Sequence, residues 1–513
     1  MSARIHHRTI AALAVVAILV AACQASAASS SPVATSTPGS PVARPSRSAA
    51  TPPAAPTPVV ASPSPPLATP VPSSTQSAGS PAPAASWVPA GSMIADWFGG
   101  TATPVGGGGA LALASDGTSA QRWDPATATW RAAATLNAPR SNYAAVQLHD
   151  GRVLVVGGAN DARQAYSSAY AYDPMTPMGT WTKVGLMGTA RSAPAAAVLA
   201  DGRVLVAGGA YVDKPALRGP AIPAAALVAY RPGPGAGAGA QGRSDDIAPS
   251  HQVPALATAE IFDPATGTWS PTGAMRFARA GATAVTLTDG RVLVVSPGGE
   301  LWVATDTGAS LDPRASGTTE IYDAATGRFT LAGDIPAFDR AAIAAAGVVL
   351  PDTSPWQVST GTLVALPDGG ALLVGRSDAW KHEGSVTRTL RFDAGTARWT
   401  QVGPAYACLT DFTANGSHCT PGVDLTTAFA AALPDGRVLA AGGWTATAGG
   451  GTDASRQAQA FDATTSAWSP LPSMPDARAS GRTAVLSDGS VLLVGGNDSS
   501  AGPVTAVRFV LSP

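Results

Sequence analysis

One phrase recurs along the chain from Trp87 onward, and no other feature constrains the fold as strongly. Its first half is an apolar run that follows Asp-Gly and ends in Gly-Gly, as in DGRVLVVGG at 150–158 and DGRVLAAGG at 435–443. Its second half places an aromatic residue, Asp, a turn and Trp in order, as in EIFDPATGTW at 260–269. Self-similarity with a period of tens of residues is typical of a repeat array.

Each copy of the phrase predicts two hairpins. The apolar run at 153–156 is too short for a helix and rich in Val, so it suits a strand buried on both faces. Asp-Gly before the run is a strong hairpin signal, and the Asp263-Pro264 turn joins the next two strands. Trp269 then begins the outermost strand and can wedge between units. The repeat unit is therefore a four-stranded antiparallel sheet.

These residues resemble the kelch family, whose signature is a hydrophobic strand ending in Gly-Gly, then an aromatic-Asp-Pro turn and a Trp. The resemblance covers everything after the N-terminal tail, and it extends to the propeller of galactose oxidase. It implies an all-β fold, a seven-bladed kelch-type β-propeller. Two copies depart from the signature, since one run ends in Gly375-Arg376 and Phe329 replaces one Trp.

Seven wedge positions favour seven blades over the alternative of six: Trp87, Trp130, Trp181, Trp269, Phe329, Trp399 and Trp468. The outer-strand phrase WVPAGSM at 87–93 precedes the first blade, whereas the chain ends in TAVRFVLSP at 505–513 with no Trp strand after it. We therefore expect strand 87–93 to close the ring by completing the last blade, which removes an exposed edge. The innermost strand of the first blade is expected at 94–98.

The N-terminus is expected to direct export. Residues 1–22 have the charged start and short apolar stretch of a signal peptide, and the sequence up to Cys23 resembles the lipobox of bacterial lipoproteins; an ordinary cleaved signal peptide is the alternative. Residues 23–86 are rich in Pro, Ser, Ala and Thr and should form a disordered linker. Residues 87–513 form the propeller. The protein is then lipid-anchored to the outer face of a bacterial cell membrane.

Cysteine usage agrees with export. The chain has three cysteines, and lipidation uses Cys23. Cys408 and Cys419 remain, in a compartment that permits oxidation, and we predict a disulfide between them. A metal site made of this pair alone is the less favoured alternative.

The charge composition excludes one class of binding partner. Charged residues make up 13% of the chain and the net charge is −1, with no basic stripe, so we expect no nucleic-acid partner. We expect a monomer without cofactor or metal, which meets the membrane only through its lipid anchor.

Long insertions all fall in the connections between second and third strands or between blades, which share one face of a propeller. The turns of the other face are uniformly tight. Loops that depart from a tight repeat commonly carry recognition. The strongest local cluster of candidate ligand-binding residues lies in one of these insertions, at Trp380, Lys381, His382 and Glu383.

Arginines precede the innermost strands and have two interpretations. They are Arg140, Arg191, Arg279, Arg340 and Arg478. Converging at the channel rim, they would form a concave positive site for a carboxylate or sulfate. The favoured interpretation is framework, with each guanidinium bonded to backbone carbonyls of the adjacent blade.

The sequence predicts a cell-surface binding module for an extracellular protein or glycan. No catalytic motif is present. The alternative is an extracellular carbohydrate-active enzyme of epimerase, lyase or oxidase type. A copper radical oxidase site needs two histidines, two tyrosines and a free cysteine, and the positions of His149 and the two later cysteines argue against it.

Overall fold

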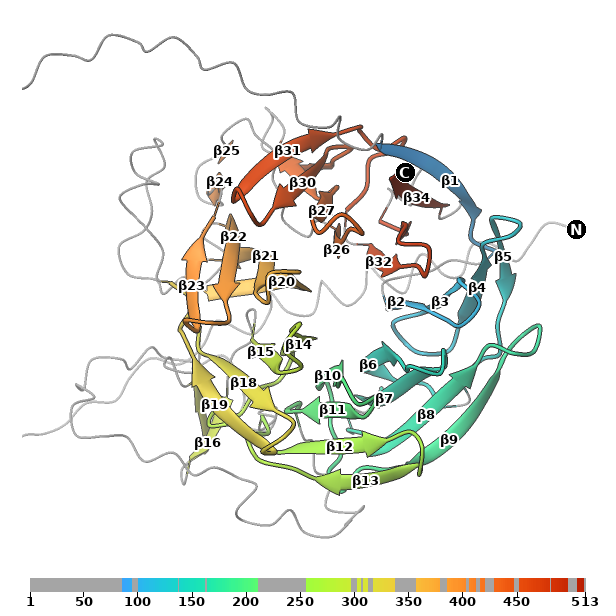
Figure 1. Ribbon diagram of the computed structural model, residues 1–513, viewed down its shortest axis with the longest axis vertical. Helices are drawn as coiled ribbons and strands as arrows, with labels where there is room; N and C mark the ends of the chain where they lie inside the picture. Colours follow the sequence, from blue (N-terminus) through green and yellow to red (C-terminus); the bar gives the residue numbers. More distant parts are fainter. Residues whose placement is uncertain are drawn as a thin grey trace, which may run out of the picture. The chain divides into compact units, whose positions relative to one another are not determined.

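The computed structural model describes residues 85–94, 100–136, 138–161, 164–210, 255–296, 302–305, 308–311, 317–336, 357–378, 385–402, 406–411, 416–419, 429–446, 452–479, 481–496 and 505–511. Within them every regular element is a β-strand. Seven antiparallel sheets of four or more strands form blades around a central axis (Figure 1). Innermost strands of successive blades contact one another around the whole ring.

Blades 1 to 4 follow in chain order. Blade 1 contains β2 (Thr101–Pro104), β3 (Ala110–Leu113), β4 (Ala120–Asp124) and β5 (Thr129–Ala132). Blade 2 contains β6 (Ser141–Gln147), β7 (Val153–Ala159), β8 (Ser168–Asp173) and β9 (Thr180–Leu186). Blade 3 contains β10 (Ala195–Val198), β11 (Val204–Ala207), β12 (Ala259–Asp263) and β13 (Thr268–Pro271). Blade 4 contains β14 (Thr283–Thr286), β15 (Val292–Val295), β18 (Thr319–Asp323) and β19 (Arg328–Ala332).

Blades 5 to 7 complete the ring. Blade 5 contains β20 (Gln357–Ala365), β21 (Ala371–Asp378), β22 (Ser385–Asp393) and β23 (Arg398–Gln401), extended by β24 (Tyr406–Asp411) and β25 (Gly416–Cys419). Blade 6 contains β26 (Phe429–Ala432), β27 (Val438–Ala441), β30 (Ala458–Asp462) and β31 (Ala467–Leu471). Blade 7 contains β32 (Arg482–Val485), β33 (Val491–Val494), β34 (Thr505–Leu511) and β1 (Ala85–Ser92). Separate hairpins are formed by β16 (Trp302–Thr305) with β17 (Gly308–Leu311), and by β28 (Trp444–Ala446) with β29 (Thr452–Ala454).

Seven blades, and the seven wedge positions, are confirmed. Each wedge residue lies on the outermost strand of its blade, and most stack on the aromatic residue of the third strand, as Trp181 does on Tyr172 with ring centroids 5.1 Å apart. The indole of Trp181 also donates to Ala134 O of blade 1 at 2.7 Å. Trp181 therefore packs within its own blade and joins it to the preceding blade by a hydrogen bond.

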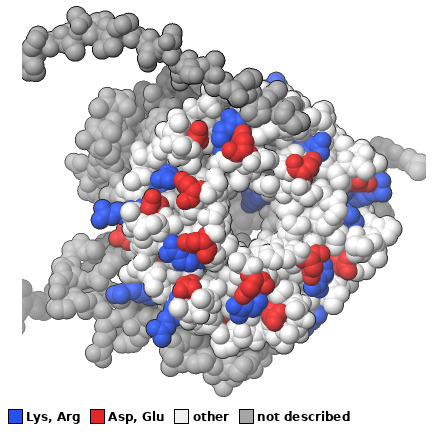
Figure 2. Space-filling model, in the orientation of Figure 1, with Lys and Arg blue, Asp and Glu red and all other residues white. Residues whose placement is uncertain are grey.

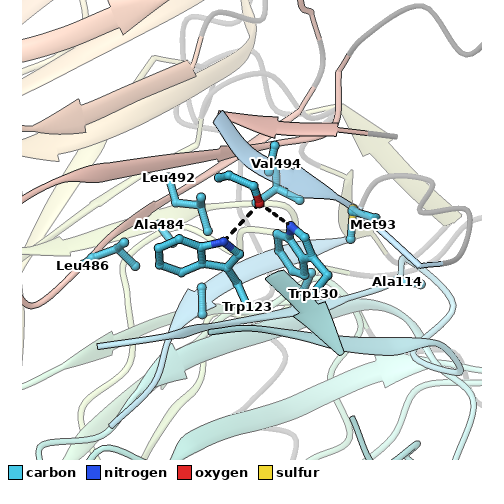
Figure 3. Close-up of a cluster of buried hydrophobic side chains, with 12 residues drawn as sticks. Met93, Ala114, Trp123, Trp130, Ala484, Leu486, Leu492 and Val494 are labelled. Atoms are coloured by element: carbon cyan, nitrogen blue, oxygen red, sulfur yellow. Dashed lines mark hydrogen bonds between the residues drawn. The ribbon is translucent and has the colours of Figure 1, made fainter. Parts of the chain in front are cut away.

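The ring closes as the sequence predicts. β1 pairs antiparallel with β34, with Trp87 opposite Phe509. At this junction the indoles of Trp123 and Trp130 both donate to Ala90 O, at 3.1 and 3.0 Å (Figure 3). One expectation was wrong: the innermost strand of blade 1 is β2, which begins at Thr101 rather than within 94–98.

The second strands are the most buried parts of the fold. All four residues of β15 are fully buried, because each blade packs both faces against neighbours. Asp-Gly turns enter these strands, and Gly151 has a φ of +86°, a conformation that glycine adopts without steric cost.

Candidate ligand-binding site at the mouth of the central channel

Strand order assigns every insertion to one face of the propeller. The hairpin β16–β17 lies between the second and third strands of blade 4, and β28–β29 between those of blade 6. The hairpin β24–β25 follows blade 5 and extends its sheet through pairing of β24 with β22. We call this side the insertion face. The opposite side, which carries the Asp-Gly and Asp-Pro turns, is the turn face.

Charges on the turn face neutralise one another locally. Arg203 pairs with Asp201 at 2.7 Å within one turn, and Arg437 with Asp435 at 2.6 Å within another. The hydrogen bond from Arg203 holds the pKa of Asp201 below its ordinary value. Figure 2 shows acidic and basic side chains next to one another around a central hollow. This pattern offers no large field of one sign to steer a charged ligand.

The repeated arginines are framework, and the interpretation as an open positive mouth was wrong. Their side chains are buried: Arg140 is 1% exposed, and Arg191, Arg279 and Arg478 are 0% exposed. The expected partners were wrong, however: Arg191 Nη1 donates to Gly208 O and Thr258 O, both at 2.8 Å, in the blade that the arginine itself begins and not in the adjacent blade. No ligand can reach these guanidinium groups without opening the blades.

The Gly-Gly motif joins three of these arginines, Arg191, Arg279 and Arg478, to the preceding blade. Gly209 N donates to Arg279 O at 2.7 Å. A Cβ on Gly208 would lie 2.4 Å from the same carbonyl oxygen, closer than any side chain allows. The same pair of contacts recurs between Gly157-Gly158 and Arg191. The arginine side chain thus links strands within its own blade, while its carbonyl links adjacent blades.

Two buried glutamates complete this framework, and sequence reasoning missed them. Glu260 pairs with Arg191 at 3.0 Å and Glu320 with Arg279 at 3.1 Å. Burial lowers the pKa of the Arg279 guanidinium, and the charge of Glu320 opposes that shift. The sequence does mark these two residues, because in two blades only a Glu stands three residues before the Asp of the turn. The two pairs are Glu260 with Asp263 and Glu320 with Asp323.

Blade 2 replaces that carboxylate with aromatic rings. Tyr170 occupies the position of Glu260 and Glu320 relative to the turn Asp. The guanidinium of Arg140 lies 4.7 Å from the ring centroid of Tyr166 and 4.9 Å from that of Tyr170. Cation–π contacts therefore stabilise this charge in place of an ion pair.

Arg340 is not part of the repeat. In four blades the arginine lies ten residues before the Asp of the Asp-Gly turn, as with Arg140 and Asp150. In blade 5 the turn Asp is Asp368, so the equivalent position is Val358 in β20. Arg340 itself lies outside the described residues.

A different arginine is exposed on an innermost strand. Arg482 is exposed at the insertion-face end of β32, the innermost strand of blade 7. Its Nε donates to Gly100 O and its Nη1 to Gly481 O, both at 2.9 Å. Burial among the surrounding blades lowers the pKa of the guanidinium, and Tyr143 partly offsets the shift. Across the described residues, no carboxylate pairs with Arg482.

Polar groups of blade 2 adjoin this position. The hydroxyl of Tyr143 donates to Ala114 O at 2.7 Å, and burial raises the pKa of Tyr143 to about 12, so it stays neutral. Asn142 is exposed with a φ of +54°, a conformation that Asn tolerates better than most residues. Ala193 N donates to Asn142 O at 2.7 Å. Arg482, Tyr143 and Asn142 lie at the insertion-face ends of the innermost strands β32 and β6, and we call this end of the channel the channel mouth.

The remaining predicted site residues are those at 380–383 and the three cysteines, and most of them lie outside the described residues. Trp380, Lys381, His382 and Glu383 lie outside the described residues, between the paired positions Asp378 and Ser385. Cys23 is also outside them. Cys408 and Cys419 are direct register partners in β24 and β25, and such pairs have the Cα separation that a disulfide requires. The disulfide stays a prediction.

The described residues contain no group of three or more His, Cys, Asp or Glu that could hold a metal ion. Nor does that part of the chain include a helix long and apolar enough to cross a membrane.

A family-model match agrees with the repeated blades. The Kelch motif family model matches residues 140–187 and 426–475, which span blade 2 and blade 6. No curated protein matches the sequence. A solved structure titled "Structure of YjhT" is similar, with 14% identity, 73% of this chain and 96% of that chain covered, and a TM-score of 0.40. The two Kelch motif matches each cover one blade and agree with the fold that the strand order shows, a seven-bladed β-propeller.

Proposed function

We propose that this protein is an exported, lipid-anchored binding module, whose insertion face takes an extracellular protein or glycan. The placement of all the long insertions on one side of the ring supports this proposal most strongly. Such loops, positioned by a fixed scaffold, are the common carriers of recognition in repeat folds. The channel mouth lies on the same face and offers a cation that no described carboxylate neutralises.

Arg482 favours a ligand that carries a carboxylate or sulfate. Its Nε and Nη1 are held by backbone carbonyls, which fixes the plane of the guanidinium. A charge-assisted hydrogen bond to an anion is worth about 1.5–3 kcal/mol. The channel mouth would therefore select acidic groups within a larger ligand held by the insertions.

A binding screen of the mature chain against extracellular proteins and polysaccharides tests this function. We expect Arg482→Ala to weaken binding of an acidic ligand by roughly tenfold or more, as loss of one charge-assisted hydrogen bond predicts, while the free energy of unfolding changes by less than about 1 kcal/mol. Arg203→Ala on the turn face is the matched control and should bind normally. Equal binding by both variants would remove Arg482 from the site, and turnover of a glycan would favour the enzyme alternative.

The anchor is tested separately. Cys23→Ser should abolish incorporation of a labelled fatty acid and release the protein from the membrane fraction, because the thiol that accepts the lipid is gone. Cys408→Ser is the control and should keep the label. If Cys23→Ser still carries the label, or still sediments with membranes, the lipid-anchor proposal fails.

A further inference from the structure

Two methionines break the pattern that the others follow. Met93, Met187, Met275 and Met474 come at the end of outer-strand segments and are 5%, 4%, 2% and 2% exposed. Met175 is 86% exposed and Met178 is 53% exposed. Both lie in one turn of blade 2, between β8 and β9. This turn is an exception to the uniformly tight turns that the sequence predicts for the turn face.

The turn is longer than its equivalents. Trp181 follows Asp173 by eight residues, whereas Trp269 follows Asp263 by six. The turn of blade 2 therefore has two more residues than the compact Asp-Pro-Ala-Thr-Gly turn at 263–267. The longer turn projects its apolar side chains into solvent, where nothing in the described part of the chain covers them.

The backbone of this turn is nevertheless fixed. Met178 O accepts hydrogen bonds from Ala134 N at 2.7 Å and from the Tyr172 hydroxyl at 2.9 Å. Arg122 Nη1 donates to Pro174 O at 2.6 Å. Because both ends are tied to blades 1 and 2, the turn cannot carry the methionines inward without breaking these bonds.

We propose that Met175 and Met178 form a site of reversible methionine oxidation on the turn face. A peroxide is the oxidant: its terminal oxygen is transferred to the thioether sulfur, the O–O bond breaks, and hydrogen peroxide leaves as water. The sulfur loses two electrons and becomes a sulfoxide, which methionine sulfoxide reductases can reverse. The four core sulfurs are inaccessible to the same reagent. Oxidation thus changes the polarity of one surface turn and leaves the blades intact.

This inference rests on burial and hydrogen bonding alone, so it stands independently of the proposed ligand. The test treats the folded mature protein with hydrogen peroxide and follows each methionine by peptide mass spectrometry. We expect Met175 and Met178 to oxidise at least tenfold faster than the four core methionines, with Met175 the faster. In urea-unfolded protein all six should react at similar rates. Similar rates in the folded protein, or earlier reaction of a core methionine, would overturn the proposal.

A double variant completes the test. Met175→Leu with Met178→Leu keeps the turn apolar and removes both accessible sulfurs. It should take up almost no oxygen under conditions that oxidise the parent, and both proteins should unfold at the same temperature before and after treatment. Oxygen uptake equal to that of the parent, or unfolding of the parent on limited oxidation, would contradict the proposed site.

Discussion

Replacing Arg279 by methionine should destabilise the propeller by about 3–5 kcal/mol, because it leaves a buried carboxylate without its cation. Arg279 is fully buried, and its Nη2 lies 3.1 Å from Glu320 and 2.9 Å from the Thr318 hydroxyl. Methionine matches the apolar stem but satisfies none of these groups. Urea unfolding of the two proteins measures the difference.

The matched control is Arg203→Met on the turn face. Arg203 forms an ion pair of similar length with Asp201, at 2.7 Å, but both side chains are more than 40% exposed. Exposed pairs contribute about 0–1 kcal/mol, so this variant should unfold almost like the parent. Equal losses from Arg279→Met and Arg203→Met would show that the burial of the repeated arginine has no energetic role.

A double variant separates the ion pair from the other bonds of Arg279. Glu320 also accepts from Arg276 N at 2.7 Å and Phe277 N at 3.2 Å. Glu320→Gln keeps an acceptor for one of these amides and removes the charge. Combined with Arg279→Met, it should cost at least 1 kcal/mol less than the sum of the single losses, since the orphaned charge is gone. Strict additivity would argue against the pair.

The fold could be predicted from sequence because the repeat encodes each contact several times. The wedge aromatics, the Gly-Gly pairs and the Asp-Gly turns recur with the blades. When one copy departs from the pattern, as where Phe329 replaces Trp, the other features still predict that blade, so the predicted number of blades is unchanged. The junction was also predictable, since the C-terminal segment supplies three strands of one blade and the N-terminal phrase supplies the missing outer strand.

The site could not be predicted to the same extent, because it depends on single residues that do not repeat. Arg482 follows Arg478 by four residues, and only the structure shows that Arg478 is buried while Arg482 is exposed. Arg340 lies 28 residues before Asp368, whereas the other four arginines each lie ten residues before their turn Asp, so its spacing differs from theirs.

Removing β1 should have the other large effect. A chain that begins at Gly99 lacks the outer strand of blade 7 and should lose on the order of 5 kcal/mol or more of stability relative to a chain that begins at Pro83. The indole N–H groups of Trp123 and Trp130 lose their acceptor, Ala90 O, and each orphaned buried donor costs about 1–3 kcal/mol. Burial of Met93 against the same cluster contributes about 1.5–3 kcal/mol more.

The lost strand also exposes the edge of β34. Trp87 no longer stacks on Phe509, whose ring centroid lies 4.9 Å away, and the unpaired backbone of β34 becomes a template for other chains. The shorter protein should therefore aggregate on heating, as light scattering would show. A synthetic peptide of residues 83–94 should restore stability, and the same peptide with Trp87→Ala should restore less. Equal unfolding of the two chains without peptide would mean that the ring does not depend on this closure.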